Sequence, residues 1–451
     1  MGLKLSQAFK GLESSLKDMD ANLRTCPLKI QGQLTRSVGL TLEAKGFVAP
    51  IGSVCLIDNQ GHDIQAVVSG FSDDKLFLMP IDMVDGLPPH ASITPSFETL
   101  KTPVGQSLLG RVIDSCGKPL DGQGPLGCTQ TMPLYGQPIN PLKRRPITEP
   151  LDLGVSAINA LLTVGVGQRV GLFAGSGVGK SVLMGMLARY TAADVIVVGL
   201  IGERGREVKE FIELNLGDAI KKAVVVAAPA DYPPLLRLNG AWAAMTIAEY
   251  FRNQGKNVLL LMDSLTRFSQ AQREIGLAMN EPPATKGYPP SAFALLPRLI
   301  ERAGTGEEGG GAITAIFTVL AEGDDQQDPI VDAARAVLDG HFVLSRKYAE
   351  LGHYPAIDIE ASVSRVMNSI VSPEHQNLAR QFKKYYALYL ENQDLISMGA
   401  YVNGSQPELD FAIANMGAMR NYLHQAQNVR VEFKEALNRL MSVMSPMTHN
   451  P

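Results

Sequence analysis

The sequence has few cysteines, no long apolar run and almost no excess of charge of either sign. Its apolar runs, such as residues 258–262, are far shorter than the about 20 residues of a membrane span, and residues 4–18 carry charges where a secretory signal would be apolar. We therefore expect no transmembrane segment and no signal peptide. No cysteine pair has C-x-x-C spacing and no histidine cluster accompanies them, so we expect reduced thiols in a cytoplasmic protein, at Cys26, Cys55, Cys116 and Cys128.

The balance of charges narrows the possible partners. The 451 residues include 41 lysines and arginines against 45 acidic residues, which leaves a net charge of −4. Such a charge provides no general attraction for nucleic acid or anionic lipid. With 45% hydrophobic and 19% charged residues the chain is typical of globular proteins, and its length allows about three domains of about 150 residues each.

The start of the sequence predicts a helix followed by a small barrel. In residues 1–24 the apolar side chains recur at spacings of three and four, which places them on one stripe of an amphipathic helix: Leu5, Phe9, Leu12, Leu16, Met19 and Leu23. Residues 25–98 contain short β segments, such as 53–57 and 75–80, with a turn cluster at 58–61. Several short strands joined by turns favour a small β-barrel domain.

The rest of the sequence predicts an α/β domain followed by helices. Residues 99–150 are rich in glycine and proline and look like a connection. From about 151 to 370, strand and helix patterns alternate, which favours a parallel sheet covered by helices. Helical patterns dominate afterwards, as in 375–392 and 407–424. We expect the α/β domain over 99–372, including the connection, and a helical carboxyl-terminal domain over 373–451.

A glycine-rich motif lies between an apolar strand segment, 170–173, and a helical pattern. Its glycines let backbone N–H groups turn toward phosphate oxygens, and the helix that follows adds the positive end of its dipole. We expect Lys180 to reach the β- and γ-phosphates of ATP and Ser181 to bind Mg²⁺. The usual pattern begins with glycine where this sequence has Ala174. The predicted phosphate-binding residues are Gly175, Ser176, Gly177, Val178, Gly179, Lys180 and Ser181.

Two acidic residues follow other strand segments and could complete a nucleotide site. Asp263 ends the apolar run 258–262 and would orient Mg²⁺, although Asp263-Ser264 would also suit the N-cap of a helix. Glu203 follows the strand segment 195–200, at the edge of the sheet where ligands bind in open α/β folds. We expect Glu203 to polarise the attacking water and Arg204 to hold it in place. The alternative for this pair is a surface charge cluster.

Residues 355–364 read Pro-Ala-Ile-Asp-Ile-Glu-Ala-Ser-Val-Ser and are followed by Arg365. This segment resembles the ten-residue signature of the catalytic subunits of the rotary ATPase superfamily. Within that superfamily the chain is similar to the type III export ATPases, and more to the flagellar members than to the injectisome members. The similarity runs from about residue 29 to the end, and its further marks are the segments 287–293, 323–329 and 338–341.

The resemblance implies a fold and a set of site residues. The fold is α/β: a RecA-like P-loop ATPase domain with a small N-terminal β-barrel and a C-terminal helical domain. It also implies a homohexamer that hydrolyses ATP with Mg²⁺ at sites between subunits. Glu203 would be the catalytic carboxylate, Arg365 an arginine finger inserted into the neighbour's site, and Tyr354 the residue that stacks on adenine. Arg267 would also approach the phosphates. Tyr354 could instead be a core tyrosine, and Arg365 an ordinary arginine at a strand end.

The resemblance also implies partners and a location. The loop from Asp324 to Pro329 would contact a central coiled-coil stalk protein, or could simply be a solvated loop. Residues 1–24 would bind a stator-like negative regulator, although they could also pack on their own barrel domain. An export-gate membrane protein, export chaperones and export substrates are the other expected partners. The protein would be cytoplasmic and peripherally associated with the export gate of the inner membrane.

Three other functions are compatible with parts of the pattern. A ring-shaped nucleic-acid helicase would need a basic channel, whereas the channel loop carries Asp324 and Asp325. A nucleotide-binding subunit without turnover is disfavoured by the presence of Glu203 and Arg365. An injectisome ATPase would perform the same chemistry in a different machine.

Overall fold

The computed structural model describes residues 30–82, 84–136, 138–320 and 328–445, and they form two compact units that divide between Thr99 and Leu100. The helix predicted for residues 1–24 and most of the predicted channel loop, 324–327, lie outside the described residues. Among the residues described, no helix is long and apolar enough to cross a membrane.

The first unit is a closed six-stranded barrel in the order β1-β2-β5-β4-β3-β6. Alternating side chains fill its interior, including Leu42, Ile57, Leu78 and Ile93, which are fully buried. The turn predicted at 58–61 joins β3 to β4, and Gln60 and Gly61 both have positive φ, 54° and 99°, as a tight hairpin turn requires. The strands are β1 (Gly32–Val38), β2 (Thr41–Lys45), β3 (Ser53–Asn59), β4 (His62–Ser72), β5 (Lys75–Pro80) and β6 (Ser92–Thr99).

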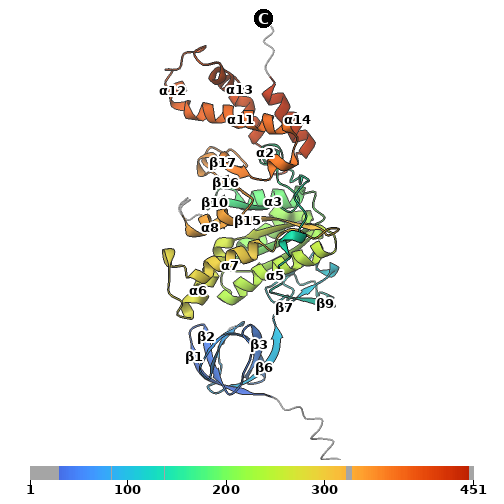
Figure 1. Cartoon of the computed structure of the whole chain (residues 1–451), viewed down its shortest axis with the longest axis vertical. Helices are drawn as coiled ribbons and strands as arrows, with labels where there is room; N and C mark the ends of the chain where they lie inside the picture. Colours follow the sequence, from blue (N-terminus) through green and yellow to red (C-terminus); the bar gives the residue numbers. More distant parts are fainter. Residues whose placement is uncertain (1–29, 83, 137, 321–327, 446–451) are drawn as a thin grey trace, which may run out of the picture. The chain divides into compact units, whose positions relative to one another are not determined.

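The second unit is built on a mostly parallel sheet in the order β17-β16-β10-β15-β13-β11-β12-β8 (Figure 1). Its inner strands are continuous apolar runs buried on both faces, which is why they lack the alternation of the barrel strands. The strands are β8 (Val112–Ile113), β10 (Arg169–Ala174), β11 (Val195–Ile201), β12 (Ala223–Ala228), β13 (Asn257–Asp263), β15 (Ala312–Leu320), β16 (Gly340–Leu344) and the antiparallel β17 (Ile357–Ser364).

Shorter strands accompany this sheet. The segment predicted as a connection contributes β8 to the edge of the sheet, where it pairs with β12, and forms a separate two-stranded ribbon. Strands of two to four residues show no measurable hydrophobic period, so the sequence pattern could not reveal them. The ribbon consists of β7 (Lys101–Val104) and β9 (Gln130–Pro133), and β14 (Gly304–Thr305) pairs with β15.

Helices cover both faces of the sheet. One face is covered chiefly by α5 against β11, β12 and β13, and by α6 and α8 against β15, whereas α3 packs against β13 on the other face. The helices of this region are α2 (Ser156–Leu161), α3 (Lys180–Tyr190), α4 (Gly205–Glu210), α5 (Pro234–Asn253), α6 (Leu265–Ala278), α7 (Pro290–Ile300), α8 (Pro329–Val337), α9 (Arg346–Glu350) and α10 (Met367–Ile370).

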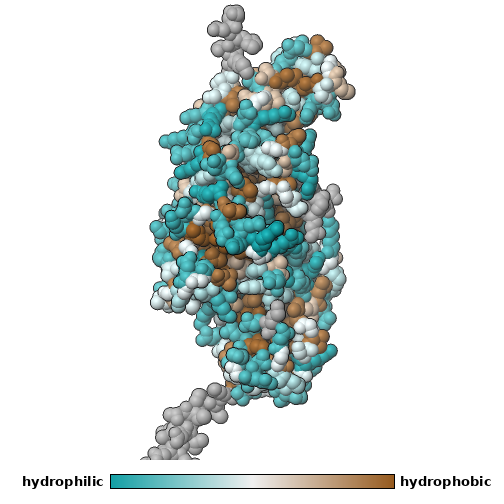
Figure 2. Space-filling view, turned by 180° about the vertical axis from the view of Figure 1, so that it is seen from behind, coloured by the Kyte–Doolittle hydropathy of each residue, from teal (hydrophilic) through white to brown (hydrophobic). Residues whose placement is uncertain are grey.

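The carboxyl-terminal helices share a core with the sheet. Phe382, Tyr422 and Leu440 lie in the same buried cluster as Leu172 of β10, and α14 packs on α2. The face of the molecule in Figure 2 is mainly hydrophilic, and its apolar side chains are exposed only in patches. The helices are α11 (Pro373–Glu391), α12 (Gln393–Ser397), α13 (Pro407–Leu423) and α14 (Phe433–Met444).

Candidate functional site

The predicted phosphate loop connects the end of β10 to the first residue of α3. Gly177 and Gly179 adopt positive φ values of 75° and 90°, a conformation that side-chain-bearing residues rarely take. Gly179 is the N-cap of α3, so the helix begins at Lys180 and directs its unpaired N–H groups at the loop. The Ser181 side chain is exposed in the first turn of that helix. The loop therefore has the geometry of an anion-binding site.

Lys180 lies between the two predicted acidic residues. Its Nζ donates to Asp263 Oδ1 at 2.6 Å and to Glu203 Oε1 at 3.3 Å, and all three side chains are at most 13% exposed. The Thr318 hydroxyl of β15 also donates to Asp263 Oδ1, at 2.6 Å. Because β10, β11 and β13 are parallel, their carboxyl ends bring Lys180, Glu203 and Asp263 to one edge of the sheet.

The trio combines one basic group with two acidic groups, and each shifts the pKa of the others. Burial acts to lower the pKa of Lys180, but the carboxylates of Asp263 and Glu203 outweigh it and hold that pKa above its usual value. Burial raises the pKa of Asp263 and of Glu203, in each case against the opposing effect of Lys180. One ammonium thus faces two carboxylates, and a cation brought in with an anionic ligand would balance them.

The alternative role considered for Asp263, that of a helix N-cap, is taken by its neighbour Ser264. The Ser264 Oγ accepts from the N–H of Arg267 at 3.2 Å and caps α6, whereas the Asp263 carboxylate faces Lys180. A cap satisfies orphan backbone donors and needs only one short polar side chain. Asp263 is therefore left available to the site.

A cavity of about 460 Å³ adjoins the phosphate loop. Tyr354 forms part of its wall beside Gly179, where an added Cβ would lie 3.3 Å from the tyrosine ring. The loop 424–427 forms a further part of the wall, and its Gln425 N–H donates to the Tyr354 carbonyl at 3.0 Å. Sequence reasoning missed this loop because it lies about 70 residues beyond Tyr354 and carries no motif. A half-exposed tyrosine over an apolar cavity suits a flat heterocycle.

Arg267 packs against Gly202 at this edge of the sheet, but the other two predicted arginines do not gather there. The Arg204 side chain is 79% exposed and pairs with Glu207 at 3.9 Å. Arg267 donates to Gln270 at 2.8 Å. Arg365 lies at the opposite edge, because Ser364 pairs with Gly340, next to the start of β10. The five residue steps of β10 separate the two edges by about 17 Å, so Arg365 cannot reach the phosphate loop of its own subunit.

Comparisons with known proteins identify the family of this chain. Residues 154–364 match the model of the ATP synthase alpha/beta family, nucleotide-binding domain, and residues 371–442 match that of the T3SS EscN ATPase C-terminal domain. The chain is 59% identical to the flagellum-specific ATP synthase of Pseudomonas aeruginosa over 421 residues. The aligned region covers 92% of this chain and 93% of that protein. The chain belongs to the family of flagellar and type III secretion ATPases.

Solved structures of this ATPase family confirm the predicted fold class. The assembled ATPase EscN of the type III secretion system of enteropathogenic E. coli superposes with a TM-score of 0.87 at 43% identity, covering 91% of this chain and 99% of that one. EscN in complex with its central stalk EscO superposes with a TM-score of 0.85, at the same identity and coverage. The barrel, the parallel sheet and the carboxyl-terminal helices of this export ATPase are those the sequence predicted.

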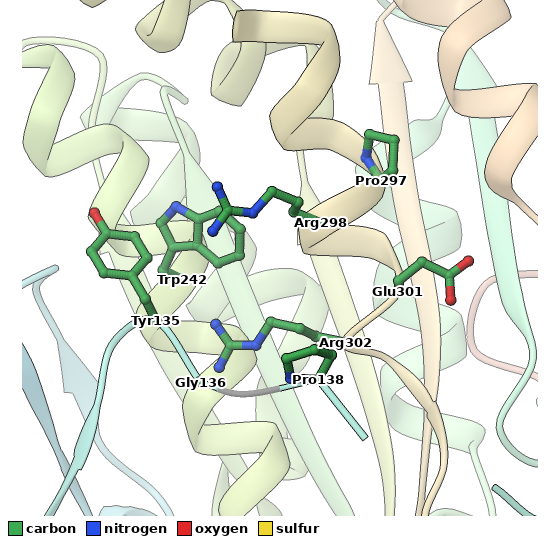
Figure 3. A pocket seen from close by; sticks show the side chains of 8 residues that line it. All are labelled: Tyr135, Gly136, Pro138, Trp242, Pro297, Arg298, Glu301 and Arg302. Atoms are coloured by element: carbon green, nitrogen blue, oxygen red, sulfur yellow. The ribbon is translucent and has the colours of Figure 1, made fainter. Parts of the chain in front are cut away.

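A second cavity, of about 320 Å³, lies away from the phosphate loop, between α5 and α7 (Figure 3). The Arg298 and Arg302 side chains extend toward Trp242 and Tyr135 there. The buried Arg302 guanidinium is already used, because it binds Glu249 at 2.5 and 2.9 Å and the carbonyl of Leu134 at 2.9 Å. The Arg302 guanidinium is therefore part of a buried ion pair and is not available to a ligand in this cavity.

Proposed function

We propose that the chain hydrolyses Mg-ATP in a ring of identical subunits and thereby energises flagellar type III protein export, releasing chaperones and admitting substrates to the export gate. The observation that carries the proposal is Lys180 held between Asp263 and Glu203 at the mouth of a glycine loop. A lysine, a strand-end aspartate and a second acid are the groups that phosphoryl transfer to water needs.

Each residue of the site has a definite role in this proposal. Lys180 exchanges its carboxylate partners for the β- and γ-phosphates and neutralises charge there. The exposed Ser181 hydroxyl and the Asp263 carboxylate are hard oxygen donors that suit Mg²⁺, which binds phosphates with few protein ligands. The ion would spread the negative charge that develops on the phosphate oxygens. Glu203, released from Lys180, accepts a hydrogen bond from the attacking water, with Arg204 beside it.

Tyr354 would stack on the adenine ring in the cavity closed by the loop 424–427. Arg365 would act in the site of the neighbouring subunit, which its distance from its own phosphate loop supports. That arrangement requires a closed ring, which we propose to be a homohexamer, and the assembled form of EscN supports it. Arg267 would contribute to the phosphate site, since its side chain lies against Gly202.

The experiment that tests this function mixes two inactive variants. Arg365→Ala should lower phosphate release by about 10³-fold while nucleotide affinity stays within about threefold, because a finger acts mainly in the transition state. Lys180→Ala should also be inactive. Rings that contain both variants pair some intact loops with intact fingers, so activity should return. Mixed rings, verified by a differential tag, that stay inactive would contradict the action of Arg365 across the interface.

The partners are proposed from the relatives and the sequence. A central coiled-coil stalk protein would contact the loop from Asp324 to Pro329, which the complex of EscN with its central stalk EscO supports. Residues 1–24 would bind a stator-like regulator, and an export-gate membrane protein would hold the cytoplasmic enzyme at the inner membrane. Export chaperones and substrates complete the set, and nucleic acid is not among them. Deleting residues 1–24 should remove regulator binding, measured by calorimetry, while basal hydrolysis remains.

An injectisome role is the second candidate, since the two machines share this chemistry. The identity of 59% to a flagellar protein against 43% to EscN favours the flagellar role. Restored motility, on a soft-agar plate, of a strain without its own flagellar ATPase would support that role. Restored injectisome secretion alone would support the other.

A further inference from the structure

Asp339, in the segment between α8 and β16, holds the first residue of β10 with its side chain. The Arg169 guanidinium donates to Asp339 Oδ2 at 2.9 Å and to Oδ1 at 3.1 Å, and the Arg169 N–H donates to Oδ2 at 3.1 Å. Both side chains are less than a quarter exposed. A bidentate pair of this kind fixes orientation as well as distance.

The backbone of the same residue holds Arg365. The Asp339 carbonyl accepts from the Arg365 N–H at 3.0 Å and from the Gln168 side chain, which is fully buried, at 3.1 Å. Gly340 allows the close approach, because a Cβ there would lie 2.6 Å from the Val363 carbonyl. The strand end that precedes Arg365 is therefore locked to the start of β10.

The Arg365 side chain is held far less than its backbone. Its guanidinium is exposed and donates one long hydrogen bond among the described residues, of 3.5 Å, to the Arg335 carbonyl. A fixed backbone with an exposed guanidinium is the arrangement that an arginine needs if it reaches out of its own subunit. The position of the guanidinium then depends on the residues that hold the Arg365 backbone.

We propose that Asp339, held by Arg169, is a positioning residue for Arg365 and sets where the guanidinium enters the neighbouring site. This inference rests on the proposed function of Arg365. A group that stabilises a transition state must lie within a fraction of an ångström of its productive position. A less firmly held Arg365 backbone should therefore lower kcat more than it weakens ATP binding. The segment 338–341, a family mark of the sequence, thereby has a mechanistic role.

The test uses Asp339→Ala and the isosteric Asp339→Asn, which keeps the shape but opposes an amide N–H₂ to the Arg169 donors. The matched control is Glu301→Gln, because Glu301 pairs with the other side of the same guanidinium, at 2.5 Å, and is half-exposed. We expect kcat of both Asp339 variants to fall by about tenfold or more with KM for ATP within about twofold, and Glu301→Gln to stay within about twofold of wild type.

Two further measurements separate positioning from general destabilisation. In an Arg365→Ala background, Asp339→Asn should cause no additional loss of kcat, because both act through one guanidinium. Mixed with Lys180→Ala protein, Asp339→Asn should regain activity, since its own phosphate loop is intact and its neighbour supplies a sound finger. Asp339→Asn carries the test if the alanine variant does not fold.

Several results would overturn the inference. Three of them are a loss of kcat that multiplies with that of Arg365→Ala, a rise in KM at unchanged kcat, and an equal loss of kcat in Glu301→Gln. The fourth is a mixed ring that remains inactive, which would indicate that the damage is carried along β10 to the phosphate loop of the same subunit. An Arg365→Ala enzyme with wild-type turnover would instead refute the finger itself, and the inference with it. Losses that multiply, in an Arg365→Ala enzyme whose own turnover is strongly reduced but measurable, would refute only the role of Asp339.

Discussion

Lys180 and Asp263 are 83 positions apart in the chain, and their charged groups are 2.6 Å apart at one edge of the sheet. The strand β15 lies between β13, which ends at Asp263, and β10, which leads through the glycine loop to Lys180, and it contributes Thr318 to the same carboxylate oxygen. The lysine therefore has carboxylate partners within its own chain. Binding of ATP would exchange those internal partners for phosphate rather than fill an unpaired position.

Lys180→Ala should cost both activity and stability. Without the ammonium, two buried carboxylates face each other unpaired, and we expect the unfolding free energy of the nucleotide-free protein to fall by about 3 kcal/mol. Urea denaturation measures it. Adding Asp263→Asn should recover part of the loss by removing one charge. A Lys180→Ala protein as stable as wild type would contradict the pairing of Lys180 with the two carboxylates. A Lys180→Ala protein that retains phosphate release would contradict the phosphate-loop assignment.

Glu203→Gln should separate binding from chemistry. The amide keeps the shape but is a far weaker acceptor, so phosphate release should fall by about 10²–10⁴-fold, while binding of a fluorescent ADP analogue is retained. The control is Glu210→Gln, an exposed acid of α4 that pairs with Arg206 at 3.5 Å and should keep near-wild-type turnover. Hydrolysis within a few-fold of wild type in Glu203→Gln would remove this residue from the mechanism.

The pH dependence of kcat/KM follows from the same carboxyl. Burial raises the pKa of Glu203, and only the deprotonated form can accept from water. Activity should therefore decrease as the pH falls through that raised pKa, so the acid limb should lie above the usual glutamate range. The residual activity of Glu203→Gln should lack this limb. An unchanged limb in that variant would assign the titration to another group.

Tyr354 should affect binding more than turnover. Its ring is 42% exposed in the wall of the cavity, beside Gly179. Tyr354→Phe keeps a stacking face and should behave as wild type, whereas Tyr354→Ala should raise KM for ATP by about tenfold, with kcat changed less than threefold. Steady-state phosphate release over a range of ATP concentrations measures both. A Tyr354→Ala enzyme with unchanged KM would place adenine elsewhere.

The local features of the site could be read from the sequence. Lys180 begins α3 as predicted, because positive φ at Gly177 and Gly179 turns the chain within a few residues. The strand segments 170–173, 195–200 and 258–262 lie within one residue of the ends of β10, β11 and β13, since an unbroken apolar run has few other stable environments in a globular chain, whereas the buried β15 and β16 were not predicted. The division between barrel and sheet followed from the change between short strands with turns and the alternation of strands and helices.

Only the tertiary structure decided which of these residues meet. The order of strands in the sheet is a long-range property, and it brings Lys180, Asp263 and Glu203 together while it places Arg365 at the opposite edge. It also closes the cavity beside Tyr354 with the loop 424–427, which no motif marks. Arg204 adjoins Glu203 in the sequence and is the N-cap residue of α4, but its side chain extends into solvent. The sequence by itself determined the chemical groups and their local backbone, and the packing of distant strands determined their distances.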